Sequence, residues 1–175
     1  ALTFASCENN STEQDSTEVA KDANDAKFDD TNMEKDTKFA VKAANAGMTE
    51  VQVSQLALTN ASSNDVKQFA QMMIDDHGKV NEELKATAAQ KNITLPAAPD
   101  DDAQKMISNL SEKKGKDFDK DYMNHIVNAH EDAVKLFREE ANDGHDADLK
   151  AWAAQKLPTL EQHLEQDKKI KDALM

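Results

Sequence analysis

Apolar residues recur at helical spacing in four long stretches of the chain, at about residues 33–60, 65–91, 117–142 and 146–173. In the second stretch these positions are Val66, Phe69, Met73, Val80, Leu84 and Ala88. Spacings of three and four place such side chains on one face of an α-helix. Because no window alternates apolar and polar residues, the pattern predicts an all-α fold without a sheet.

Each apolar stripe contains one polar residue that can bind a metal. The stripe of the first helix follows a regular alternation of fours and threes through Phe39, Ala43, Ala46, Glu50, Val53 and Ala57. The other three stripes carry His77, His130 and His163. All four polar residues lie near the midpoints of their helices, so packing the helices side by side brings them to one layer of the core. A buried carboxylate without a partner is costly, so Glu50 needs such companions.

The sequence leaves two interpretations of this layer open. Three imidazoles and a carboxylate can bind one transition-metal ion such as Zn, Fe or Mn. Alternatively, they form a metal-free, hydrogen-bonded cluster that fixes the register of the helices. Polar residues that can support the site are Asp76, Asp119, Tyr122 and Asp167, although for Asp76 and Asp167 a solvated flank is the simpler interpretation. His125 points about 120° away from the apolar face of its helix, and we expect it to be exposed.

A long connection joins the second and third of the long helices. Pro96 and Pro99 interrupt the helical pattern, and Asp100 begins a short helix at about residues 101–113. A connection of about 25 residues is too long for a tight hairpin. It either crosses the length of an antiparallel four-helix bundle, as in ferritin-like connectivity, or caps one end. Pro158 lies inside the fourth stripe and predicts a kink.

Charge and composition narrow the functional classes. The formal net charge is −13 and no basic stripe is present, which argues against a nucleic-acid partner. No apolar run approaches the roughly 20 residues of a membrane-spanning helix. Neither a Ser-His-Asp nor a Cys-His arrangement is apparent, so the sequence disfavours a hydrolase. Whether the protein is an enzyme of another kind stays open, and a non-enzymatic role is favoured.

The amino-terminal part predicts attachment to a membrane. Residues 1–6 and the following Cys7 resemble the end of a lipoprotein signal peptide, in which small residues precede a lipidated cysteine. Cys7 is the single cysteine of the chain, and the alternative is a free thiol in a disordered tail. Residues 1–36 hold 10 Asp or Glu and 3 Lys, so we expect residues 1–32 to be a signal remnant and a flexible acidic linker. This predicts a lipoprotein of the bacterial cell envelope, in the periplasm or at the outer membrane, whose folded domain is residues 33–175.

Several motifs carry a resemblance to a known family. The more specific ones are Asp76-His77, Phe118-Asp119 with Tyr122, the later His130, and Leu157-Pro158 followed by His163. With them, residues 33–172 resemble a family of bacterial envelope proteins described as a domain of unknown function and often labelled predicted outer-membrane protein. The resemblance implies a ferritin-like four-helix fold and leaves the activity unassigned.

The sequence departs from the metal site that a ferritin-like fold usually carries. Di-iron proteins of that fold place Glu-x-x-His on two helices and a Glu on each of the others. Here the residues three positions before the histidines of the stripes are Ile74, Val127 and Leu160. None of them is acidic, which disfavours a di-iron centre with ferroxidase or oxygenase activity. A mononuclear site or a metal-free cluster fits the sequence better.

Overall fold

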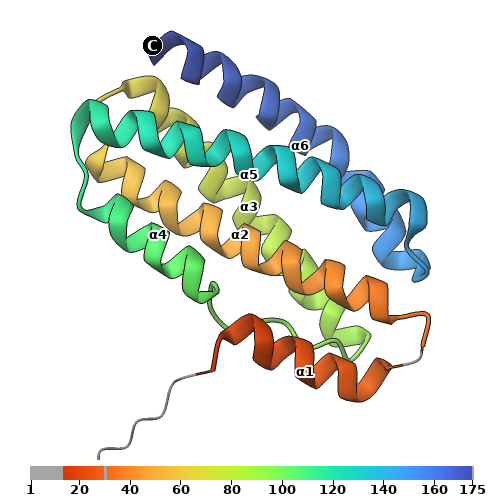
Figure 1. Ribbon diagram of the computed structural model, residues 1–175. Helices are drawn as coiled ribbons and strands as arrows, with labels where there is room; N and C mark the ends of the chain where they lie inside the picture. The colour runs from red at the N-terminus through yellow and green to blue at the C-terminus, as the bar shows by residue number, and fades with distance from the viewer. Residues whose placement is uncertain (1–13, 30, 175) are drawn as a thin grey trace, which may run out of the picture.

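The computed structural model describes residues 14–29 and 31–174, and each regular element within them is an α-helix (Figure 1). In chain order the helices are α1 (Ser16–Phe28), α2 (Glu34–Asn60), α3 (Asn64–Gln90), α4 (Asp101–Ser111), α5 (Gly115–Asp143) and α6 (Ala147–Leu174). The last five begin and end within two residues of the predicted bounds. The expected all-α fold is therefore confirmed for the described residues.

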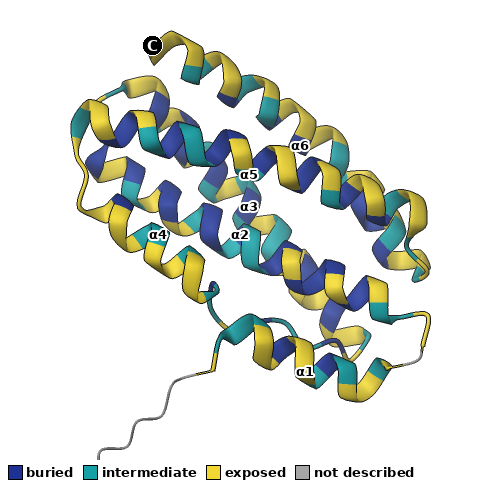
Figure 2. Cartoon of the chain, in the orientation of Figure 1, coloured by how far each residue is buried: buried dark blue, intermediate teal, exposed yellow. Residues whose placement is uncertain are grey.

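The four long helices pack side by side as a helical bundle (Figure 1). α2 packs on α3 and α5 packs on α6, in each case across a short turn, and α2 also lies along α5. The seam between α3 and α6 is the least closely packed of these four. Figure 2 shows the buried residues gathered on the inner sides of the helices, as the spacing of the apolar stripes requires.

The connection between α3 and α5 carries the chain from one end of the bundle to the other. Just after α3, the Lys91 ammonium lies 2.6 Å from Asp146, which precedes α6. At the opposite end, the backbone N–H of Ser62, in the α2–α3 turn, donates to Asp119 in α5 at 3.0 Å. α3 and α5 therefore run in the same direction, and α4 packs against α2 along the way.

A polar layer divides the apolar core into two clusters. The first contains the rings of Phe39, Phe137 and Trp152, whose centroids lie 5.1 to 6.1 Å apart. The second contains Phe69 and Phe118 near the α2–α3 turn. On every long helix, the polar residue of the stripe stands between members of the two clusters. The layer thus lies near the middle of the bundle, where the midpoint argument places it.

The prediction of a flexible linker is wrong for residues 16–28, which form α1. Asp15 caps this helix by accepting from the Thr17 N–H at 2.7 Å. Asn24 is buried, and it pairs with both backbone groups of Thr94, donating to its carbonyl at 2.8 Å and accepting from its N–H at 2.7 Å. Polar contacts to the α3–α4 connection therefore order this segment, and hydropathy does not detect them. Cys7 lies outside the described residues.

Two further expectations concern the character of the helices. α6 runs through Pro158 as one helix, so the missing backbone hydrogen bond does not divide it. Among the described residues, no helix is both long and apolar enough to cross a bilayer.

Candidate metal centre

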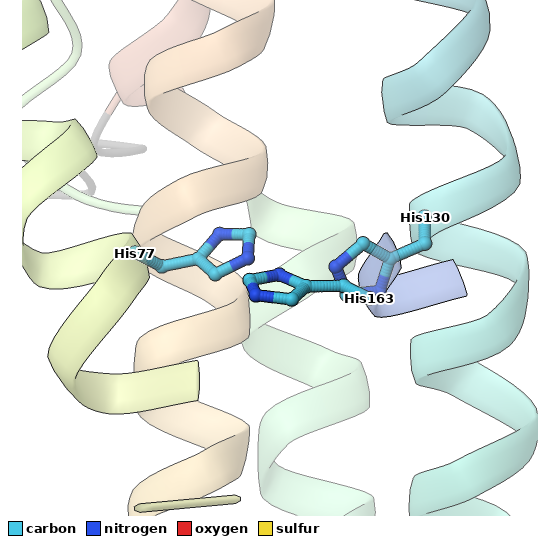
Figure 3. A group of neighbouring side chains, drawn as sticks. All are labelled: His77, His130 and His163. Carbon is cyan, nitrogen blue, oxygen red and sulfur yellow. The ribbon is translucent and has the colours of Figure 1, made fainter. Parts of the chain in front are cut away.

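Three histidines from three helices meet in the polar layer. His77 comes from α3, His130 from α5 and His163 from α6, and their rings point toward one another (Figure 3). The ring centroids are 5.4, 5.5 and 5.6 Å apart, close to an equilateral triangle. All three side chains are buried, and one ring nitrogen from each lies within 4.8 Å of the other two. We call this group the three-histidine cluster.

Each histidine of the cluster has a carboxylate beside one ring nitrogen. The pairs are His77 Nδ1 with Glu50 Oε2 at 2.8 Å, His130 Nδ1 with Asp167 Oδ2 at 3.1 Å, and His163 Nε2 with Asp76 Oδ2 at 3.3 Å. Metal-binding histidines commonly donate their second N–H to a carboxylate, which fixes the tautomer and the orientation of the ring. At His130 the hydrogen-bond acceptor is the Ile126 carbonyl oxygen, 3.2 Å from Nδ1, and Asp167 lies beside the same nitrogen without a hydrogen bond. Each ring thus has an oxygen acceptor beside one of its nitrogens.

The remaining ring nitrogens have no partner. His77 Nε2, His130 Nε2 and His163 Nδ1 are buried and make no hydrogen bond to a described residue. Leaving a buried polar atom unsatisfied costs about 1–3 kcal/mol. A tetrahedral ion bound at about 2.0–2.1 Å would bring such nitrogens to roughly 3.4 Å from one another. Small ring movements thus suffice for one ion to satisfy all three atoms.

The electrostatics of the layer favour an ionised Glu50 and a neutral His163. Burial acts to lower the pKa of His130, but the contact with Asp167 and the charge of Glu50 raise it overall. Burial alone would raise the pKa of the Glu50 carboxyl, but the charge and hydrogen bond of His77 lower it to about 2. Burial, and then the charges of the other two histidines, lower the pKa of His163 to about 4. His163 is therefore neutral at pH 7 and has a lone pair available, which metal binding requires. Burial raises the pKa of Asp167, and the contact with His130 offsets this only in part.

The structure brings most of the predicted site residues together, but some of them have other roles than the sequence predicts. Glu50 lies against His77 and is not a member of the group whose nitrogens converge. Asp167 is fully buried beside His130, and Asp76 is about one-third exposed beside His163. Both residues therefore contact the site, and the solvated-flank interpretation of Asp167 is wrong. Its position one helical turn after His163 directs it to α5, a contact that the sequence of α6 alone does not reveal.

The other predicted residues lie farther from the cluster. Asp119 accepts hydrogen bonds from the backbone N–H groups of Ser62 and Ser63, so it fixes the α2–α3 turn. The Tyr122 hydroxyl lies 2.9 Å from the Ser54 hydroxyl, and burial raises its pKa. His125, expected to be exposed, is half-buried, and burial lowers its pKa against the opposing charge of Glu50.

A buried pair of carboxyl groups that was not predicted from the sequence lies at one end of the bundle. Glu140 is 1% exposed, and neither of its side-chain oxygens has a hydrogen-bond donor. Burial, followed by the neighbouring Asp36, raises the pKa of Glu140 to about 8. Asp36 is also buried and accepts from the His145 N–H at 2.9 Å. The sequence feature that indicates burial of Glu140 is its position three residues after Phe137, which places it on the apolar face of α5.

The fold and the cluster define an all-helical protein with three buried histidines that can hold a metal ion. The chain belongs to the family described as Domain of unknown function (DUF4142), which it matches over residues 11–170. This range includes α1 and the whole bundle except the last four residues of α6. No curated protein and no solved structure matches the chain.

Proposed function

We propose that this protein binds one divalent transition-metal ion at the three-histidine cluster. The observation that carries the proposal is a repeated arrangement: each ring has an oxygen acceptor beside one nitrogen, and its other nitrogen is buried without a partner in the cluster. Three buried nitrogens without a protein partner around one point favour a shared ligand, because buried polar atoms usually have a hydrogen-bond partner.

The donor set favours a mononuclear site. Three imidazoles with no fourth ligand among the described residues are the donors of open zinc sites, and they also accept Fe or Mn. Zn²⁺ is the expected ion because imidazole nitrogen suits it and tetrahedral coordination fits three converging rings. The connection from α3 to α5 supports ferritin-like connectivity for the bundle, yet without Glu-x-x-His pairs the proposal does not extend to a di-iron centre.

We also propose that the protein works in the bacterial cell envelope, tethered through lipidated Cys7. Support comes from the small residues that precede Cys7 and from the polar residues 8–14 that separate it from α1. Expression of the complete gene in a bacterial host with an alkyne-labelled fatty acid tests this directly. Label that is present in the wild type and lost in Cys7→Ser supports the tether, and an unlabelled wild-type protein refutes it.

Metal binding is tested by loading the purified full chain with Zn²⁺, Fe²⁺ or Mn²⁺ and measuring bound metal and melting temperature. The protein should carry no polyhistidine tag. One equivalent of metal and a raised melting temperature are expected, because an ion that binds only the folded state stabilises it. His163→Ala should lose both effects. His145→Ala is the matched control, since this half-exposed histidine lies outside the cluster.

The alternative is a non-enzymatic structural or interaction lipoprotein whose layer is metal-free. It predicts less than about a tenth of an equivalent of metal after loading and no response of the melting temperature. It also predicts that apolar replacements of Glu50 and the three histidines leave stability unchanged or raise it. Absence of bound metal together with an unresponsive melting temperature would overturn the metal proposal.

A further inference from the structure

The three-histidine cluster borders a cavity of about 340 Å³. His77, His163 and Glu50 form part of its wall at the polar layer. From there the cavity extends about two helical turns, roughly 10 Å, toward Phe137. It reaches the surface at Lys79 and Thr159, along the seam of α3 and α6, which is the least closely packed seam of the bundle. A small molecule therefore has both a route to the cluster and space beside it.

The cavity wall is mainly apolar. Its apolar side chains include Val80, Leu84, Ala133, Phe137, Trp152 and Leu160. A volume of this size lies at the lower end of small-molecule pockets, which are typically about 300–1,000 Å³ and combine apolar walls with a few polar groups. The wall therefore suits a ligand with an apolar body.

The charged groups of the cavity are already paired with one another. Lys156 Nζ lies 2.5 Å from Glu83, which also accepts from the Trp152 indole N–H at 3.0 Å. Lys79 Nζ lies 3.9 Å from Asp76. In the polar layer, a divalent ion would be balanced by the buried carboxylates of Glu50 and Asp167. No unpaired positive charge is left for an anionic ligand, so a neutral ligand fits best.

We infer that the bound metal keeps one coordination position open toward this cavity, and that the cavity takes a small neutral molecule. This molecule has one lone-pair donor for the metal and an apolar body the size of an imidazole ring. The inference rests on the proposed metal binding, and it makes the site an exchangeable-ligand centre instead of a closed structural one.

The test uses the full chain loaded with Co²⁺, whose visible bands report its coordination. Free imidazole should change these bands in a saturable manner, and azide at the same concentration should have a weaker effect. Bands that do not respond to imidazole would mean that the metal site is closed, which overturns the inference. Azide that binds more tightly than imidazole would overturn the claim that the cavity prefers a neutral ligand. Failure of Co²⁺ to bind would overturn the proposed function and this inference together. Co²⁺ that binds but whose bands do not respond to imidazole would overturn this inference alone.

Val80 provides a matched pair of variants, because it lines the cavity and is only half-buried. Val80→Trp fills the space and should weaken imidazole binding about tenfold or more without loss of Co²⁺. Val80→Ala leaves the space open and should keep the affinity within about threefold. Equal imidazole affinities in both variants would show that imidazole does not enter this cavity. If Val80→Trp does not fold, the titration of the wild type still decides whether the metal has an open coordination position.

Discussion

Replacing Glu50 by Gln tests how this carboxylate acts on the site. Glu50 is 2% exposed and its Oε2 lies 2.8 Å from His77 Nδ1. Gln keeps the shape of the side chain and an oxygen that accepts from Nδ1, but it removes the charge that makes the imidazole a stronger donor to the metal. Loss of such a supporting partner typically weakens metal affinity about 10–100-fold. This corresponds to about 1.4–2.7 kcal/mol of binding free energy.

The assay is a competition titration of zinc between the protein and a chromophoric chelator. Glu131→Gln is the matched control, because Glu131 is half-exposed and pairs with Lys168 on the surface. The control should bind zinc as the wild type does. A change below about twofold in Glu50→Gln would contradict the supporting role. A loss well beyond about 100-fold would instead make Glu50 a direct ligand, as the sequence first suggested.

Three further predictions concern stability, and each is checked by urea unfolding. The pKa of Glu140 is about 8 in the folded protein, above its ordinary value of 4.5, so between these two pH values the folded state holds a proton that the unfolded chain releases. The free energy of unfolding should therefore fall as pH rises from 4.5 to about 8, and Glu140→Gln should flatten this dependence. Ala at Gly78, where a Cβ meets no atom within 4 Å, should add about 0.5–1 kcal/mol, whereas Ala at Gly115, where φ is 63°, should cost about 1–2 kcal/mol. Asn24→Ala should cost about 1–3 kcal/mol by leaving the backbone groups of Thr94 unsatisfied. The Glu140 argument would be contradicted if the free energy of unfolding of the wild type did not change with pH. The glycine argument would be contradicted if both glycine variants changed the stability in the same direction, and the Asn24 argument if Asn24→Ala were as stable as the wild type.

Residues of the apolar stripes were predictable because their positions depend on helical periodicity alone. The seam through Phe39 and Val53, and the phase of His77, His130 and His163, follow from spacings of three and four. Since all three histidines share the phase of their stripes and the height of their midpoints, periodicity also predicts that they lie close together. The convergence of the three rings is the structural result that agrees with this expectation.

The supporting contacts were less predictable because they depend on how one helix packs on another. Asp167 and Asp119 both lie on or near inward faces, yet one pairs with His130 and the other with the turn at Ser62. Their helices specify the direction of each side chain but not its partner. α1 was missed for a similar reason, since Asn24 is ordered by hydrogen bonds to a distant loop and contributes no apolar signal.

X-ray absorption at the zinc edge of the metal-loaded full chain tests the central claim most directly. The account predicts one zinc ion per chain with three imidazole nitrogens at about 2.0–2.1 Å and one further light ligand. In His163→Ala the histidine contribution should be lost together with stoichiometric binding. Substoichiometric zinc in the wild type, or bound zinc whose spectrum shows no imidazole scattering, would contradict the assignment of the three-histidine cluster as a metal centre.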